Sequence, residues 1–138
     1  MRRTNLPGLL TRAELLALTG ASSKDLDTLE RQDICRPTQR RSGGDTRPVV
    51  YDLVEAGLVT MALHAATLGV RGKRLGELLE LVRIRRSRLT ENWSGMVVFD
   101  GAGVDLVPDG VDISAWLQAT PPPKATLILH LRVPGGEM

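Results

Sequence analysis

Apolar and polar positions near the start of the chain predict two short helices joined by a tight turn. Thr11 followed by Glu14 has the spacing of a capping box, in which each side chain accepts a hydrogen bond from the other residue's backbone N–H. Gly20 suits the residue after a helix end, where a positive φ is favourable chiefly for glycine. The core-facing positions would be Leu15, Leu16 and Leu18 in the first segment and Leu26, Leu29 and Ile34 in the second, which Ser22 or Ser23 would cap. This pattern is typical of a helix-turn-helix and equally of an ordinary αα-hairpin.

A polar, turn-rich segment at residues 36–50 follows the second helix. Its centre is the pair Gly43-Gly44, and two adjacent glycines between extendable segments predict the tip of a β-hairpin. The segment holds one acid, Asp45, against four arginines, which are Arg36, Arg40, Arg41 and Arg47. Because phosphate contacts dominate the affinity of proteins for nucleic acids, the pattern predicts a DNA-contacting wing, with a solvated loop as the alternative.

Two longer helices are predicted next, separated by a break at residues 69–72. Asp52 suits the cap of the first, and its core-facing positions are Leu53, Leu58, Met61, Leu63 and Leu68. The second covers residues 73–91 and carries a heptad-like stripe of Leu75, Leu78, Val82 and Leu89. Its end holds four arginines, which a helix C-terminus favours and which could instead bind phosphate or pair with the acidic end of the chain. They are Arg83, Arg85, Arg86 and Arg88.

From Trp93 onwards the pattern changes to a period of two that is interrupted by turns. It predicts strands over residues 96–99, 104–107 and 125–133, with one or two helical turns at residues 113–117. The whole chain is therefore predicted to be mainly α with a β wing. A winged helix-turn-helix would span residues 1–72, a connecting helix residues 73–92, and a small β-rich module residues 93–138.

Charge is divided unevenly along the chain, whose net charge is +2. Residues 1–92 hold 16 basic and 11 acidic side chains, a net charge of +5. Residues 93–138 hold 2 basic and 5 acidic side chains, a net charge of −3. The basic part is therefore the candidate for binding a polyanion.

Several classes of protein do not fit the residue content. The single cysteine, Cys35, and the two histidines, His64 and His130, lack the spacing of metal ligands, so we expect neither a metal nor a cofactor. The sequence offers no acid/base or nucleophile constellation, which indicates that the protein is not an enzyme. The most apolar stretch, residues 53–70, contains Glu55 and His64 and reads as a buried helix rather than a membrane span. No targeting segment stands out, so we expect a cytoplasmic protein without a membrane partner.

The predicted order of elements resembles the DNA-binding domain of MerR-type transcription regulators over about residues 9–82. Residues 10–15 match the start of the family's first helix and residues 18–22 its turn. The further matching positions are Leu26 and Glu30 in the recognition helix, Ile34 and Pro37 before the wing, Arg47 and Tyr51 at its close, and residues 68–70 with Leu75 before the fourth helix. The chain departs from the family at Asp27, where an Arg is usual, and at Leu29, where an aromatic residue is usual.

The resemblance implies a sequence-specific transcription regulator that binds double-stranded DNA as a homodimer on an inverted repeat. The recognition helix, residues 23–32, would enter the major groove. The implied DNA contacts are Thr11, Arg12, Ser22, Ser23, Lys24, Thr28, Arg31, Arg40, Arg41, Arg47 and Tyr51. The implied dimer contacts are Leu75, Leu78, Leu79, Val82 and Leu89.

The alternative is an adaptor, such as an antitoxin or a phage-type control factor. It would bind a protein partner through the winged fold or the acidic C-terminal module. Asp25 and Asp27 favour it, because they place negative charge on the helix that should enter the groove.

Overall fold

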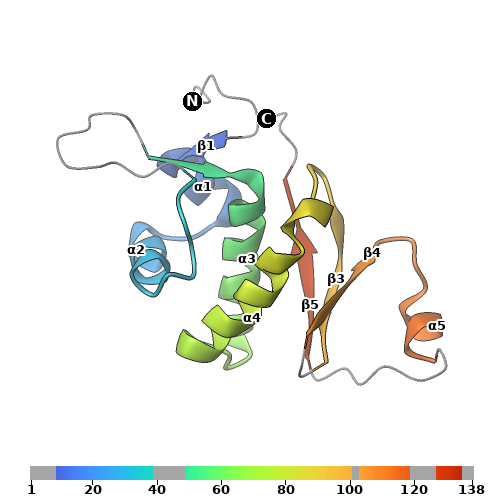
Figure 1. The fold of residues 1–138 in the computed structure, drawn as a ribbon. Helices are drawn as coiled ribbons and strands as arrows, with labels where there is room; N and C mark the ends of the chain where they lie inside the picture. Colours follow the sequence, from blue (N-terminus) through green and yellow to red (C-terminus); the bar gives the residue numbers. More distant parts are fainter. Residues whose placement is uncertain (1–8, 39–48, 101–102, 119–126, 135–138) are drawn as a thin grey trace.

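The computed structural model describes residues 9–38, 49–100, 103–118 and 127–134. These residues form a mixed α/β fold with five α-helices and two small antiparallel sheets (Figure 1). In chain order the elements are β1 (Leu9–Thr11), α1 (Arg12–Thr19), α2 (Ser23–Arg31), β2 (Val50–Asp52), α3 (Leu53–Thr67), α4 (Gly72–Ile84), the 3₁₀ turn η1 (Arg86–Arg88), β3 (Ser94–Phe99), β4 (Val104–Pro108), α5 (Ile113–Leu117) and β5 (Leu127–Arg132). The predicted wing falls mostly on residues 39–48, outside the described residues, and stays a prediction.

Capping boxes begin both helices of the predicted helix-turn-helix. Thr11 accepts a hydrogen bond from the backbone N–H of Glu14, whose carboxylate accepts one from the Thr11 N–H in return, which confirms the predicted box. Gly20 has a φ of 74° and ends α1, as predicted. A second box joins Ser22 and Asp25 at the start of α2. Hydrogen bonds between residues three positions apart therefore set the start of each helix.

A short strand pair lies beside these helices. β1 and β2 are antiparallel, with Leu10 opposite Tyr51. Next to this pair, the backbone N–H of Thr38 donates to the carbonyl of Val50 across 2.9 Å. The chain thus leaves the strand region after Thr38 and returns to it at Val49, so both ends of the segment that contains the predicted wing meet at one place. The strand β1 was not predicted, because its three residues are too few to show a period.

α3 is the central helix of the fold and is buried around its whole circumference over residues 53–59. It packs against α1, α4 and β5. Its approach to β5 is close at Gly57, where an added Cβ would lie 2.8 Å from the carbonyl oxygen of Arg132 and 3.0 Å from Cδ1 of Leu131. Glycine is thus what lets this helix lie directly against the strand.

The C-terminal strands form a three-stranded sheet in the order β4-β3-β5. Val97 stands between Leu106 and Leu129 in the register, and all three side chains are buried in the same core as α3. Figure 1 shows this sheet on one side of α3 and α4, with α1 and α2 on the other. The three segments that the sequence divides at residues 72 and 92 therefore share one hydrophobic core. Among the described residues, no helix combines the length and the apolar character needed to cross a membrane.

Candidate nucleic-acid interface

The outer face of α2 carries Lys24, Thr28 and Arg31, while Leu26 and Leu29 bury its inner face. The spacing of three and four residues places these polar side chains on one side of the helix. The Thr28 hydroxyl donates to the carbonyl of Lys24 across 3.0 Å, and the Arg31 guanidinium donates to the Thr28 oxygen across 3.3 Å. Within the described part of the chain, neither Lys24 nor Arg31 has an acidic partner. Both cations are therefore available to an external anion.

All three acids on α2, which are Asp25, Asp27 and Glu30, accept hydrogen bonds from within the protein. The Asp25 carboxylate accepts from the Ser22 N–H across 3.1 Å, as the reciprocal half of the capping box. Asp27 accepts from Nη2 of Arg12 across 2.8 Å. Asp27 thus joins α2 to α1 through Arg12. The acids that favour the adaptor alternative therefore also stabilise the fold, by capping α2 and by joining it to α1.

Arg12 is directed at α2 rather than at solvent. Its guanidinium donates to Asp27, to Glu30 across 3.2 Å and to the Ser23 hydroxyl across 3.1 Å. Thr11 is likewise occupied as the cap of α1. Among the predicted DNA contacts, Arg12 and Ser23 therefore join α1 to α2, while Thr11 and Ser22 each cap the start of one helix.

Tyr51 lies in the core, with 1% of its surface exposed. Its hydroxyl donates to Oε1 of Glu30 across 2.5 Å. Burial raises the pKa of this hydroxyl, and the hydrogen bond to Glu30 raises it further. A side chain this deeply buried cannot touch DNA in this conformation, which contradicts the predicted contact. Tyr51 instead anchors α2 to β2.

The beginning of α4 adds cations that sequence reasoning missed. Its N-cap position is Arg71, whose guanidinium donates to the carbonyl of Ala66 at the end of α3 and makes no hydrogen bond to the start of α4. No acid lies in the first turn of α4. The free N–H groups and the positive end of the helix dipole are therefore left without a capping anion. Arg71 and Lys73 place two further cations there. The run Arg-Gly-Lys-Arg at residues 71–74 is the feature of the sequence from which they could have been predicted.

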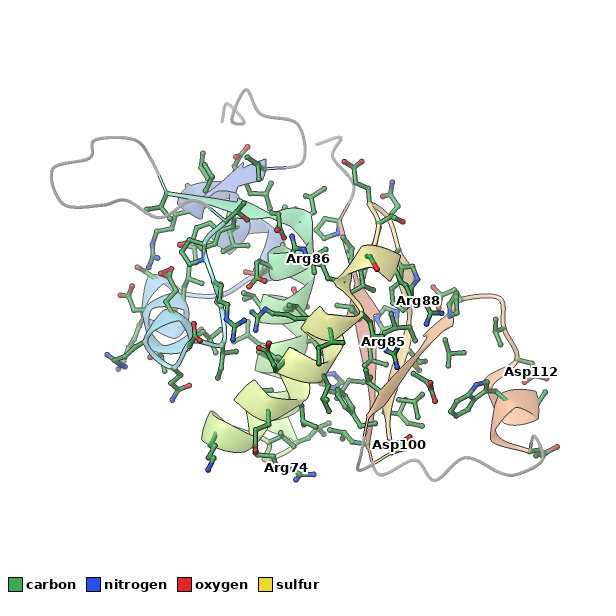
Figure 2. The ribbon with its side chains drawn as sticks, viewed as in Figure 1. Arg74, Arg85, Arg86, Arg88, Asp100 and Asp112 are labelled. Carbon is green, nitrogen blue, oxygen red and sulfur yellow. The ribbon has the colours of Figure 1, made fainter. Side chains whose placement is uncertain are left out.

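This first turn of α4 adjoins the outer face of α2. A groove of about 480 Å³ is lined by Lys24, Thr28 and Gln32 on one side and by Arg71 and Gly72 on the other. A second hollow of about 550 Å³ has Lys73 and Gln32 in its lining, together with the acids Asp33, Glu77 and Glu80. Figure 2 shows Arg74 at the start of α4 on the side away from α2. The exposed cations of α2 and of the α4 start, without Arg74, therefore form one face.

The four arginines at the end of α4 divide into two pairs. Arg83 and Arg86 reach back to acids on α3 and at its cap, which are Glu55 and Asp52. Arg85 and Arg88 are exposed and have no acidic partner in the part of the chain that the structure describes. Figure 2 shows both on the side of the C-terminal sheet. The predicted pairing with the acidic end of the chain is thus not what holds Arg83 and Arg86.

The heptad-like stripe of α4 belongs to the core of the single chain. All five predicted dimer contacts are buried within it, namely Leu75, Leu78, Leu79, Val82 and Leu89. Side chains covered by their own chain are not available to a second copy, so this stripe does not form the predicted dimer seam. By contrast, Ile84 at the end of α4 is 70% exposed.

The remaining predicted contacts, Arg40, Arg41 and Arg47, lie outside the described residues. Cys35 is buried, and burial together with the nearby charge of Glu55 raises the pKa of its thiol to about 12. Within the residues described, no group of three or more potential ligands could hold a metal ion. No known family model matches the chain, and no curated protein matches it.

Proposed function

We propose that this protein binds double-stranded DNA as a transcription regulator, with α2 in the major groove. The observation that carries the proposal is the division of charge on α2. Its acids, Asp25, Asp27 and Glu30, accept hydrogen bonds from within the protein, whereas Lys24 and Arg31 remain exposed and without an acidic partner among the described residues. Two cations are therefore left for an external anion on a helix whose own side chains sum to a net charge of −1.

The geometry of one face supports the same function. The major groove is about 12 Å wide and admits one helix. Lys24, Thr28 and Arg31 would then face base edges, where Lys and Arg pair with guanine and Thr contacts the thymine methyl group. Arg71 and Lys73 at the start of α4 suit the adjacent phosphates, since a helix N-terminus binds anions. The predicted wing arginines, Arg40, Arg41 and Arg47, would add contacts to the backbone.

A dimer on an inverted repeat remains part of the proposal, but its contact surface must lie outside the buried stripe of α4. Ile84, at the end of the same helix, is an exposed apolar side chain that could contribute to such a surface. Light scattering on the full chain, with and without a duplex, measures whether two copies associate.

The experiment is a titration of random duplex DNA at several salt concentrations. Binding should weaken steeply as salt rises, with a slope of roughly 0.9 per neutralised phosphate. Lys24→Ala with Arg31→Ala should lower the affinity, because it removes both cations that face the base edges, and should leave most of the salt slope in place. The matched control is Arg85→Ala with Arg88→Ala, which removes the same charge from the sheet side. No binding by the wild type at low salt, or equal losses in both variants, would remove α2 as the interface.

The adaptor alternative draws on the groove between α2 and α4. Its floor is apolar, with Leu29, Leu63 and Leu75 among the lining residues, beneath the cations of its rim. A partner of acidic and apolar character would suit it. A wild type that binds no duplex at low salt would favour this alternative over DNA binding.

A further inference from the structure

A buried ion pair joins α3 to α4. Nη2 of Arg83 lies 2.7 Å from Oε1 of Glu55, and Nε of Arg83 lies 3.2 Å from Oε2, so the pair is bidentate. The Arg83 side chain is 9% exposed and the Glu55 side chain 3%. Two charges withdrawn this far from water need both partners, because either one alone would be a buried unpaired charge.

The pair also holds the segment that directly follows α2. The backbone N–H of Arg36 donates to Oε1 of Glu55 across 2.9 Å. Arg83 donates to the carbonyl of Ile34. The Arg36 side chain then reaches Glu80 on α4, 2.7 Å away. The exit of α2 is thus tied to α3 and α4 at three polar points within three residues.

The contact between the α2 exit and α4 is packed on its inner side and open at the surface. Ile34 is 1% exposed, and an added Cβ at Gly76 would lie an ordinary 3.8 Å from it. Nearer the surface, a hollow of about 550 Å³ is lined by Gln32 and Asp33 on one side and by Gly72 and Gly76 on the other. The Arg36–Glu80 ion pair lines this open part, where apolar packing does not fix the spacing.

The ion pair contributes little net stability compared with apolar side chains in the same place. Well-packed apolar side chains of similar volume often replace a buried ion pair without loss of stability. Here Nη1 of Arg83 is moreover buried without a hydrogen-bond partner among the described residues. An ion pair with fixed bond directions does what an apolar contact cannot, which is to hold the backbone at Ile34 and Arg36 in a single geometry.

We propose that Glu55 and Arg83 are positioning residues that set the spacing between α2 and α4. They keep the cations of α2, Lys24 and Arg31, at the distance from Arg71 that lets both helices reach one duplex. This inference rests on the proposed function for its DNA consequence. Its structural half, the fixed spacing, is measurable without DNA.

The test replaces the pair by apolar residues in the full chain, as Glu55→Met with Arg83→Met. The variant should still fold, since no unpaired charge is left, but should melt at a lower temperature than the wild type because the Arg36 N–H and the Ile34 carbonyl lose their partners. The salt slope for duplex DNA should nevertheless fall by about 1 to 2, as one helix loses its phosphates at roughly 0.9 each. The double variant leaves the net charge unchanged, so the control is Arg85→Met with Asp105→Met, which removes one charge of each sign at two exposed positions. If the double variant does not fold, Glu55→Gln with Arg83→Met takes its place, because it leaves no buried charge and keeps an acceptor for the Arg36 N–H.

A spin-label distance supplies the second measurement. Labels at Arg31→Cys on α2 and Glu77→Cys on α4, in a Cys35→Ala background, should give a narrow distribution that broadens in the Glu55/Arg83 variant. An unchanged distribution together with an unchanged salt slope overturns the inference. If the wild type binds no duplex, the proposed function fails, and the label distances alone decide whether the pair positions the helices.

Discussion

Gly57 offers a direct test of how the helical part of the chain is joined to the C-terminal sheet. Replacing it by alanine adds one Cβ, 2.8 Å from the carbonyl oxygen of Arg132 and 3.0 Å from Leu131. The carbonyl belongs to the backbone of β5 and cannot swing aside as a flexible side chain can. The helix or the strand must therefore move.

Two opposing effects set the magnitude. Alanine in a helix interior is favoured over glycine by about 1 kcal/mol. Overpacking a buried contact costs about 1–3 kcal/mol. We therefore expect Gly57→Ala to lower the free energy of unfolding by about 1 kcal/mol, with an upper bound of about 2 kcal/mol.

Gly76 in α4 is the matched control. A Cβ there would meet only Cγ1 of Ile34, at the ordinary distance of 3.8 Å. Gly76→Ala should therefore keep the propensity gain and raise the free energy of unfolding by up to about 1 kcal/mol. The difference between the two variants cancels propensity and leaves the clash alone, about 1–3 kcal/mol.

Urea unfolding followed by far-UV circular dichroism measures both variants. The midpoint should fall for Gly57→Ala and rise for Gly76→Ala, with the slope of the transition unchanged. If Gly57→Ala proves as stable as Gly76→Ala, α3 does not rest on β5 at this distance, and the shared core is assembled differently.

Four further results are expected. Val82→Asp should unfold the chain rather than separate a dimer, because this side chain is fully buried; circular dichroism beside light scattering distinguishes the two outcomes. The Cys35 thiol, with its pKa raised to about 12, should resist thiol reagents in the folded state at pH 8 and react once urea unfolds the chain. Because the unfolded thiol ionises first, near pH 9, its contribution to stability should be lost as the pH rises from about 9 through 12. Tyr51→Phe should lower the free energy of unfolding by about 1 kcal/mol, and a thermal scan that shows no change would mean that the bond to Glu30 is not formed.

The features that could be predicted from the sequence are those that depend on a few neighbouring residues. The capping box of Thr11 and Glu14, the helix end at Gly20 and the cap at Asp52 are confirmed by the structure. Helix α3 and the strands after Trp93 follow the predicted periods to within a few residues. Caps and periods are local, because they are set by backbone hydrogen bonds and by which face of an element must avoid water.

The contacts between residues far apart in the sequence could not be predicted and are known from the tertiary structure. The stripe of Leu78 and Val82 shows the same period whether it faces a second copy or the chain's own core, and the structure assigns it to the core. Arg12 and Asp27 are both charged residues that the sequence alone would place on the surface, yet they pair across two helices. The acids Asp25 and Asp27 favoured the adaptor alternative in the sequence, whereas in the structure they bond to Ser22 and Arg12. Long-range partners are chosen by how whole elements pack, and no local spacing records that choice.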